Sequence, residues 1–231
     1  MKTIGLLGGM SWESTETYYR LLNEGVKARL GGLHSAKLVL YSVDFQEIDA
    51  MQRVGDWEGA GDLLAEAARR VEMAGADFLL ICTNTMHRVA PEVERHITIP
   101  LLHIADATGE AVRDRGIGRV GLLGTRFTME QDFYRGRLRE RFGLNTLIPD
   151  ATDRRRIHEV IFRELCLGRF DSDARTDFCR IIEGLARRGA EAVILGCTEI
   201  SLLVRPEDTP VPLLDTTRLH AEKAVAVALD S

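Results

Sequence analysis

The chain alternates between short, continuously apolar runs and longer segments whose apolar residues recur at helical spacing. Asp77–Cys82 reads as a continuous apolar strand, whereas Gly59–Ala74 places Leu63, Leu64, Ala67 and Val71 along one helical face. Continuous apolar strands that alternate with amphipathic helices are typical of parallel sheets covered on both faces. The pattern therefore predicts an α/β fold built from short, mostly parallel sheets flanked by helices.

The same order of elements occurs in two consecutive halves of the chain. In the first half, Ser11 is a plausible N-cap for a helix that runs to Val26, and the predicted strands are Ile4–Leu7, Lys37–Ser42, Asp77–Cys82 and Ile99–Leu102. In the second half the predicted strands are Val120–Leu123, Asn145–Ile148, Ala192–Leu195 and Val211–Leu214. Helices are predicted over Asp106–Arg115, Met129–Arg141, Arg155–Cys166, Ala174–Arg187 and His220–Leu229.

An internal repeat relates the two halves. Gly75–Thr85 reads GADFLLICTNT and Gly189–Glu199 reads GAEAVILGCTE, which sets Thr83 against Cys197. We expect two similar, pseudo-twofold-related α/β halves, residues 1–104 with 215–231 and residues 105–214. Ligands bind beyond the carboxyl ends of parallel strands, so we expect the active site in the cleft between the halves.

Composition and charge exclude several classes of function. The net charge is −5 and the isoelectric point about 5.7, so nucleic acid and anionic membrane surfaces are unfavourable partners. The apolar start is too short for a secretion signal, and no stretch approaches the roughly 18 apolar residues of a membrane span. The four cysteines lack CxxC spacing, which predicts a cytoplasmic protein with reduced thiols.

Cys197 is the strongest candidate for chemistry. It follows a strand, so neighbouring helix amides are expected to favour its thiolate, and Glu199 can accept a proton or orient the thiol. The alternative for a free cysteine is an inert, buried position. That alternative is expected for Cys82, whose side chain points away from that of Thr83, and for Cys166 and Cys179.

Thr83 is the counterpart of Cys197 in the first half. Its hydroxyl is a much weaker acid than a thiol, so it either transfers a proton slowly or only binds a ligand. Asn84, Thr85 and Thr198 add an amide, hydroxyls and backbone N–H groups, a combination that suits a small carboxylate or ordinary helix capping.

Two further features of the sequence bear on nucleotide and metal binding. The glycine-rich segment Gly5–Gly9 lacks both the GxGxxG and the Walker spacing, so we expect its glycines to admit a ligand to the backbone and not to bind a nucleotide. The six histidines show no metal-binding spacing, so no metal site is expected. Only His87 is expected near the candidate site.

Four motifs together resemble the aspartate/glutamate racemase family, which works without pyridoxal phosphate. They are IGLLGGMSWEST at Ile4–Thr15, CTNTMH at Cys82–His87, LLGTRFTM at Leu122–Met129 and LGCTEI at Leu195–Ile200. The resemblance covers the whole chain and implies two α/β halves, a dimer, no cofactor, and two cysteines that exchange the α-proton from opposite faces of an amino acid.

Cys197 matches the second cysteine of the family, which acts on the L enantiomer, whereas Thr83 stands where the first cysteine is usual. This resembles the subgroup of L-aspartate/glutamate-specific or broad-specificity racemases. The resemblance implies substrate binding by Met10, Gln52, Thr83, Asn84, Thr85 and Thr198. A lysine that binds the side-chain carboxylate in many aspartate racemases is replaced here by Cys166.

The resulting hypothesis is a cofactor-independent amino-acid racemase acting on L-aspartate, L-glutamate or a broader set such as homoserine. Cys197 would abstract the α-proton and the Thr83 side would return one. The alternatives are a non-catalytic amino-acid sensor, favoured by Thr83, and an enzyme resembling hydantoin racemase or maleate isomerase.

Overall fold

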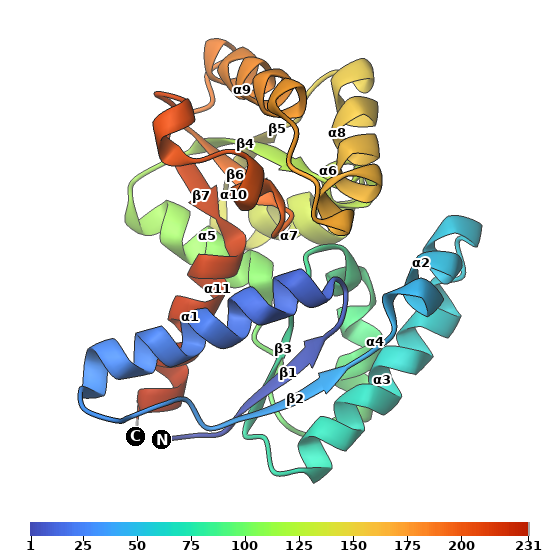
Figure 1. Ribbon diagram of the computed structural model, residues 1–231, viewed down its shortest axis with the longest axis vertical. Coiled ribbons are helices and arrows are strands. Elements are labelled where there is room, and N and C mark those ends of the chain that lie inside the picture. The colour runs from blue at the N-terminus through green and yellow to red at the C-terminus, as the bar shows by residue number, and fades with distance from the viewer. Residues whose placement is uncertain (231) are drawn as a thin grey trace. The chain divides into compact units, whose positions relative to one another are not determined.

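The computed structural model describes residues 1–230 and divides into two compact units (Figure 1). The first unit comprises Met1–Ile104 and resumes at His220, and the second is Ala105–Leu219. None of the helices within residues 1–230 has the length and apolar character that crossing a bilayer requires.

The first unit contains a parallel sheet of order β2-β1-β3. Its strands are β1 (Ile4–Gly8), β2 (Leu38–Ser42) and β3 (Phe78–Ile81). The strand predicted at Ile99–Leu102 is reduced to a single parallel bridge between Leu101 and Leu79. Pro100 has no N–H, and the amides of Thr98 and Ile99 donate to the Glu72 carboxylate. Pairing with β3 is therefore limited to the bonds that Leu79 makes with the Pro100 carbonyl and the Leu102 amide.

Helices cover both faces of this first sheet. They are α1 (Trp12–Leu30), α2 (Phe45–Val54), α3 (Trp57–Met73), the 3-10 helix η1 (Thr85–Val89), α4 (Ala90–His96) and, from residue 220 onward, α11 (Thr216–Leu229). Ser11 caps α1, as predicted, by accepting from the Ser14 amide at 3.3 Å. The sequence analysis did not predict α2.

Alternation along the strands divides the core of the first unit between the two faces of the sheet. Ile4, Leu6 and Cys82 pack with α1 and α11, whereas Leu7 and Ile81 pack with α3. Cys82 is fully buried, which confirms its predicted place in the core. Thr83, the next residue, follows the end of β3 and is partly exposed.

The second unit repeats this topology with a parallel sheet of order β5-β4-β6-β7. Its strands are β4 (Arg119–Gly124), β5 (Asn145–Leu147), β6 (Ala192–Gly196) and β7 (Leu213–Asp215). Its helices are α5 (Ile104–Asp114), α6 (Arg126–Glu130), α7 (Asp132–Phe142), α8 (Ala151–Arg163), η2 (Leu165–Leu167), α9 (Ser172–Arg187), α10 (Ile200–Leu203) and η3 (Pro206–Asp208). The predicted α/β class with two similar units is confirmed.

Two helices of the second unit differ from their predicted bounds. The helix predicted over Met129–Arg141 is split into α6 and α7 because Gln131 adopts an extended backbone conformation. The helix predicted over Arg155–Cys166 ends at Arg163, and Cys166 lies in the short 3-10 turn that follows.

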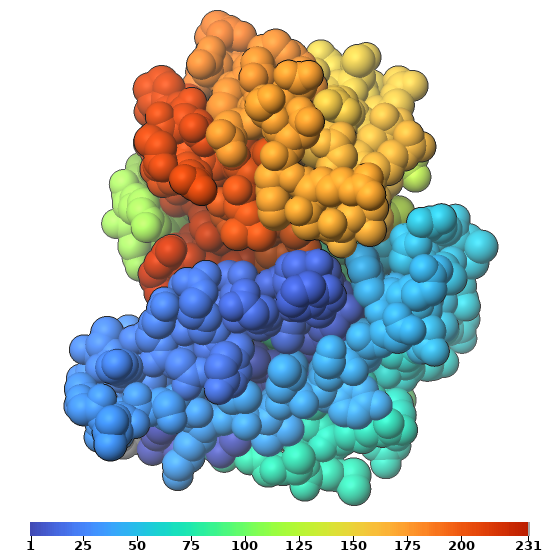
Figure 2. Space-filling view, viewed as in Figure 1, coloured from blue at the N-terminus to red at the C-terminus, as the bar shows by residue number. Residues whose placement is uncertain are grey.

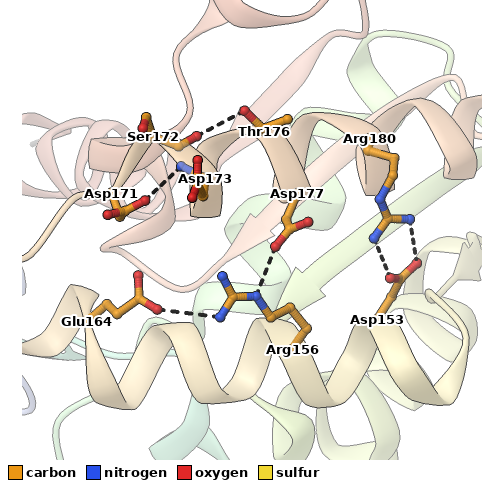
Figure 3. Close-up of polar contacts among 9 residues, drawn as sticks. All are labelled: Asp153, Arg156, Glu164, Asp171, Ser172, Asp173, Thr176, Asp177 and Arg180. Atoms are coloured by element: carbon orange, nitrogen blue, oxygen red, sulfur yellow. Dashed lines mark hydrogen bonds and ion pairs between the residues drawn. The ribbon is translucent and has the colours of Figure 1, made fainter.

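An ion-pair ladder joins α8 to α9 (Figure 3). Arg180 donates to both oxygens of Asp153, at 2.6 and 3.3 Å, and Arg156 donates to Asp177 at 2.9 Å. Arg156 also reaches Glu164, which directly precedes η2, at 3.5 Å. Of the three consecutive arginines 154–156, only Arg155 is therefore exposed.

Candidate active site

The candidate residues of the second unit follow β6 directly. Gly196 ends the strand beside Gly124 of β4, and a Cβ atom at Gly196 would lie only 2.9 Å from the Leu123 carbonyl oxygen. Glycine therefore lets the two strand ends lie close together. The chain turns immediately afterwards, which leaves the Cys197 side chain partly exposed and buries Thr198 and Glu199.

The Glu199 carboxylate accepts hydrogen bonds from three side chains. The Cys197 thiol donates to its Oε2 atom at 2.9 Å and the Thr198 hydroxyl donates to the same oxygen at 2.6 Å. The Cys166 thiol lies 4.0 Å from Oε1, the other oxygen. Glu199 is only 3% exposed, so this carboxylate is held against Cys197 with little competition from water.

The protonation of Cys197 differs from the sequence-based prediction. Burial, the negative charge of Glu199 and the Cys166 thiol raise the pKa of the Cys197 thiol well above its usual range. A backbone hydrogen bond from Glu199 opposes this shift and is outweighed. The prediction of a favoured thiolate was wrong because burial and the neighbouring Glu199 carboxylate both favour the protonated thiol, and α10 is only a single turn.

The candidate residues of the first unit follow β3. Thr83 is partly exposed, whereas Asn84 and Thr85 are buried at the start of η1. His87, one turn further on, is 1% exposed, and its Nδ1 atom lies 2.7 Å from the Thr83 carbonyl oxygen. The Ile104 amide donates to Nε2 of the same ring at 3.2 Å.

These two bonds define the tautomer of His87. A carbonyl oxygen can only accept, so Nδ1 carries the proton, and Nε2 must be unprotonated to accept from Ile104. His87 is therefore a neutral ring that holds the backbone at Thr83 and does not contact the Thr83 hydroxyl through these bonds. Its place beside the candidate loop agrees with the prediction.

The remaining residues implied by the resemblance also lie in the first unit. Met10 is buried in the packed layer that also contains Met86, and Gln52 of α2 donates from Nε2 to the Met86 sulfur at 3.0 Å. The Gln52 Oε1 atom is buried and has no hydrogen-bond partner within residues 1–230. An unpaired buried acceptor is costly, so this amide is a candidate ligand-binding group.

The glycine-rich segment at the end of β1 has a structural role. Gly9 has a φ of 90°, and a Cβ atom there would clash with the Val43 carbonyl oxygen. Glycine is thus required at this position by the close approach of the chain after β2.

Cys166 is the residue that sequence reasoning misplaced. Its helical position predicted a place in the core, whereas the resemblance aligned it with a lysine that binds substrate in many aspartate racemases. It is partly exposed and its thiol lies near Glu199. Nothing in the spacing of Cys166 and Glu199 along the chain indicates this contact. Cys179 is likewise partly exposed. Within residues 1–230, no cluster of three or more histidine, cysteine or acidic side chains could hold a metal ion.

Comparison with known proteins defines the class. A crystal structure of a candidate Asp/Glu racemase from Yersinia pestis is 53% identical, covers 100% of both chains and superposes with a TM-score of 0.93. An aspartate racemase homologue from Pyrococcus horikoshii is 34% identical over 99% of both chains, with a TM-score of 0.84. The broad specificity amino-acid racemase RacX of Bacillus subtilis is 20% identical over 98% of both chains.

These similarities define an enzyme, an isomerase of the amino-acid racemase class. The chain belongs to the Asp/Glu/Hydantoin racemase family, whose model matches residues 7–224. The predicted resemblance and the predicted class of enzyme are therefore confirmed.

Proposed function

We propose that this racemase works without a cofactor on L-aspartate, L-glutamate or a broader set such as L-homoserine. Cys197 removes the α-proton, and the Thr83 side returns a proton to the opposite face. The observation that carries this proposal is the hydrogen bond from the Cys197 thiol to the buried Glu199 carboxylate. A thiol whose pKa is raised needs such an acceptor before it can act as a base.

In the first chemical step, the Cys197 thiol passes its proton to Glu199. The resulting thiolate can then remove the α-proton of the substrate. Asn84, Thr85 and Thr198 are assigned to the substrate carboxylate, with Met10 and Gln52 as further substrate contacts. Hydrogen bonds to that carboxylate stabilise the charge that develops on the α-carbon. The buried and unpaired Oε1 atom of Gln52 supports its assignment, because an ammonium group would satisfy it.

Thr83 is assigned the second proton transfer, directly or through a water molecule. Its hydroxyl is a weak acid and a weak base, so the step that it serves is slow. The internal repeat, which aligns Thr83 with Cys197 after β3 and β6, supports this role. The neutral His87 ring at the Thr83 carbonyl gives the loop a fixed anchor.

Chiral chromatography of the product tests the function. The purified protein is incubated with L- and D-aspartate, glutamate and homoserine, and with a substituted hydantoin because the family name includes that class. We expect the opposite amino-acid enantiomer to appear with wild-type protein and Cys179→Ala, and not with Cys197→Ala. Turnover that survives in Cys197→Ala contradicts the mechanism, and turnover of the hydantoin alone contradicts the substrate class.

We also propose a homodimer located in the cytoplasm. Large apolar side chains that are exposed on α1 and the following loop support the dimer, because a partner would cover them: Trp12, Tyr19, Leu30 and Leu33. This segment lies on the visible surface of the first unit (Figure 2, blue). The four free cysteines support a reducing compartment. Light scattering after gel filtration tests the dimer, and a monomer mass contradicts it.

A further inference from the structure

Two thiols of the second unit share one carboxyl group. Cys197 Sγ lies 2.9 Å from Glu199 Oε2, and Cys166 Sγ lies 4.0 Å from Glu199 Oε1. Cys166 comes from the turn after α8 and Cys197 from the loop after β6, so residues distant in sequence are brought to one side chain. The proposed racemisation uses only one of these thiols.

We propose that Cys166 and Cys197 form a reversible disulfide when the enzyme meets a peroxide. Redox-sensitive cysteines are accessible, often lie beside a second, resolving cysteine, and usually have a low pKa. The pKa of Cys197 is raised, so its first step requires Glu199 as the acceptor of the thiol proton. Both thiols are partly exposed, and each has an oxygen of Glu199 as a nearby proton acceptor. Cys82, by contrast, is fully buried in the core of the first unit.

The reaction balances in two steps. The Cys197 sulfur attacks one oxygen of hydrogen peroxide, the S–O bond forms as the O–O bond breaks, and the leaving hydroxide takes the thiol proton to become water. The Cys166 sulfur then attacks the Cys197 sulfur, the S–S bond forms as the S–O bond breaks, and a second water leaves with the Cys166 proton. Glu199 is the acceptor that can hold the proton in each step.

The short turn that carries Cys166 allows its sulfur atom to approach that of Cys197. A disulfide brings the sulfurs to about 2.05 Å, so the Glu199 carboxyl group must leave the space beside them. Cys166 lies in a one-turn 3-10 helix that ends at Gly168 in a left-handed conformation, with buried Leu165 on one side and exposed Leu167 on the other. This short turn, unlike the interior of a long helix, can shift without breaking a ladder of helical hydrogen bonds.

The consequence for activity rests on the proposed function. A disulfide removes the thiol of Cys197 and separates it from Glu199, so racemisation stops until a reductant restores both thiols. Thiol–disulfide exchange provides that restoration.

Peptide mapping tests the proposal without relying on activity. Native wild-type protein is treated with hydrogen peroxide, its remaining thiols are alkylated, and the peptides are analysed without reduction. We expect a linked pair that contains Cys166 and Cys197 and the loss of two hydrogens in the intact mass. Cys179→Ala is the matched control and forms the same link, whereas Cys166→Ala forms none and accumulates oxygen on Cys197.

The disulfide and the racemase function can be contradicted independently of each other. Wild-type protein that gains oxygen on Cys197 without the link, or that links Cys179, overturns the disulfide proposal even if racemisation is observed. A link formed in a protein that racemises no amino acid overturns the proposed function and leaves the disulfide established. With both correct, peroxide removes most of the racemase activity. Dithiothreitol restores it fully in wild type, whereas Cys166→Ala, in which Cys197 can be oxidised beyond the reversible sulfenic acid, recovers less.

Discussion

The Cys197 thiol donates to the Glu199 carboxylate across 2.9 Å, and this carboxylate is almost completely buried. The pair has two opposed effects on reactivity. The negative charge of Glu199 raises the pKa of the thiol, which lowers the fraction of thiolate. The same carboxylate oxygen can also accept the thiol proton. Its contribution to catalysis depends on which effect dominates.

Replacing Glu199 with Gln separates these effects. Loss of the negative charge is expected to lower the pKa of Cys197, so the pH midpoint for its alkylation by iodoacetamide should move down. Turnover should nevertheless fall by about 10²- to 10⁴-fold, the usual effect of losing a general base. Faster turnover in Glu199→Gln would show that the carboxylate only suppresses the thiolate. Cys197→Ala identifies the background from other thiols.

Replacing Thr83 with Cys is expected to accelerate the slow side of the reaction. A thiol is far more acidic than a threonine hydroxyl, so solvent exchange of the α-proton of D substrates should rise at least about tenfold. Because the equilibrium constant between enantiomers is one, kcat/KM for racemisation must rise equally in both directions. Thr176→Cys, on the exposed surface of α9 and outside the proposed site, is the matched control. An unchanged D exchange rate in Thr83→Cys contradicts the role of Thr83.

His87 is predicted to stabilise the candidate loop. His87→Phe keeps a ring but removes the hydrogen bonds that His87 makes with the Thr83 carbonyl and the Ile104 amide. Each is buried or partly buried, so the free energy of unfolding should fall by about 1–3 kcal/mol in urea denaturation. His34→Phe on the exposed loop after α1 should change it by less than about 0.5 kcal/mol. Equal stability of the two variants would contradict the anchoring role.

His220 is predicted to make folding sensitive to mild acid. Its Nε2–H donates to the Leu102 carbonyl at 2.8 Å, and its Nδ1 accepts from the Tyr18 hydroxyl at 2.8 Å, so the buried ring is neutral. Burial lowers the pKa of His220 to about 4 from an ordinary value of 6.5. The unfolded chain therefore binds a proton between these values while the folded protein does not.

Because the unfolded chain takes up this proton and the folded protein does not, acid lowers the stability of the fold. Stability from His220 is complete above about pH 6.5 and is lost as the pH falls toward 4, by about 3 kcal/mol in total. Urea denaturation at several pH values should show this loss in wild type and a shallower one in His220→Gln. Identical slopes in the two proteins would mean that another group titrates.

The sequence predicted the parts of the fold that depend on local patterns. The strand cores, the Ser11 cap and the internal repeat follow from apolar periodicity and residue type, so β1, β3, β4 and β6 were found. The strand expected at Ile99–Leu102 is reduced to a single bridge, partly because Glu72, distant in sequence, accepts from the amides of Thr98 and Ile99. Such tertiary competition leaves no trace in a local pattern.

In the candidate site, too, the sequence predicted what depends on local residue order and not what depends on tertiary contacts. Cys197 and Thr83 were located by the repeat, and Glu199 by its adjacency to Cys197. Cys166 was misplaced because its contact with Glu199 depends on how the turn after α8 packs. The direction of the Cys197 pKa shift was also missed, since it results from burial and from a side-chain conformation that residue order does not define.

The most direct test of the account is α-proton exchange followed by NMR in D₂O. Wild-type protein and Cys197→Ala are compared on L- and D-aspartate, glutamate and homoserine, with Cys179→Ala as the control. We predict that wild type and the control exchange the α-proton of L substrates much faster than that of D substrates, and that Cys197→Ala exchanges neither. Undiminished exchange of L substrates in Cys197→Ala would contradict the assignment of Cys197 as the base.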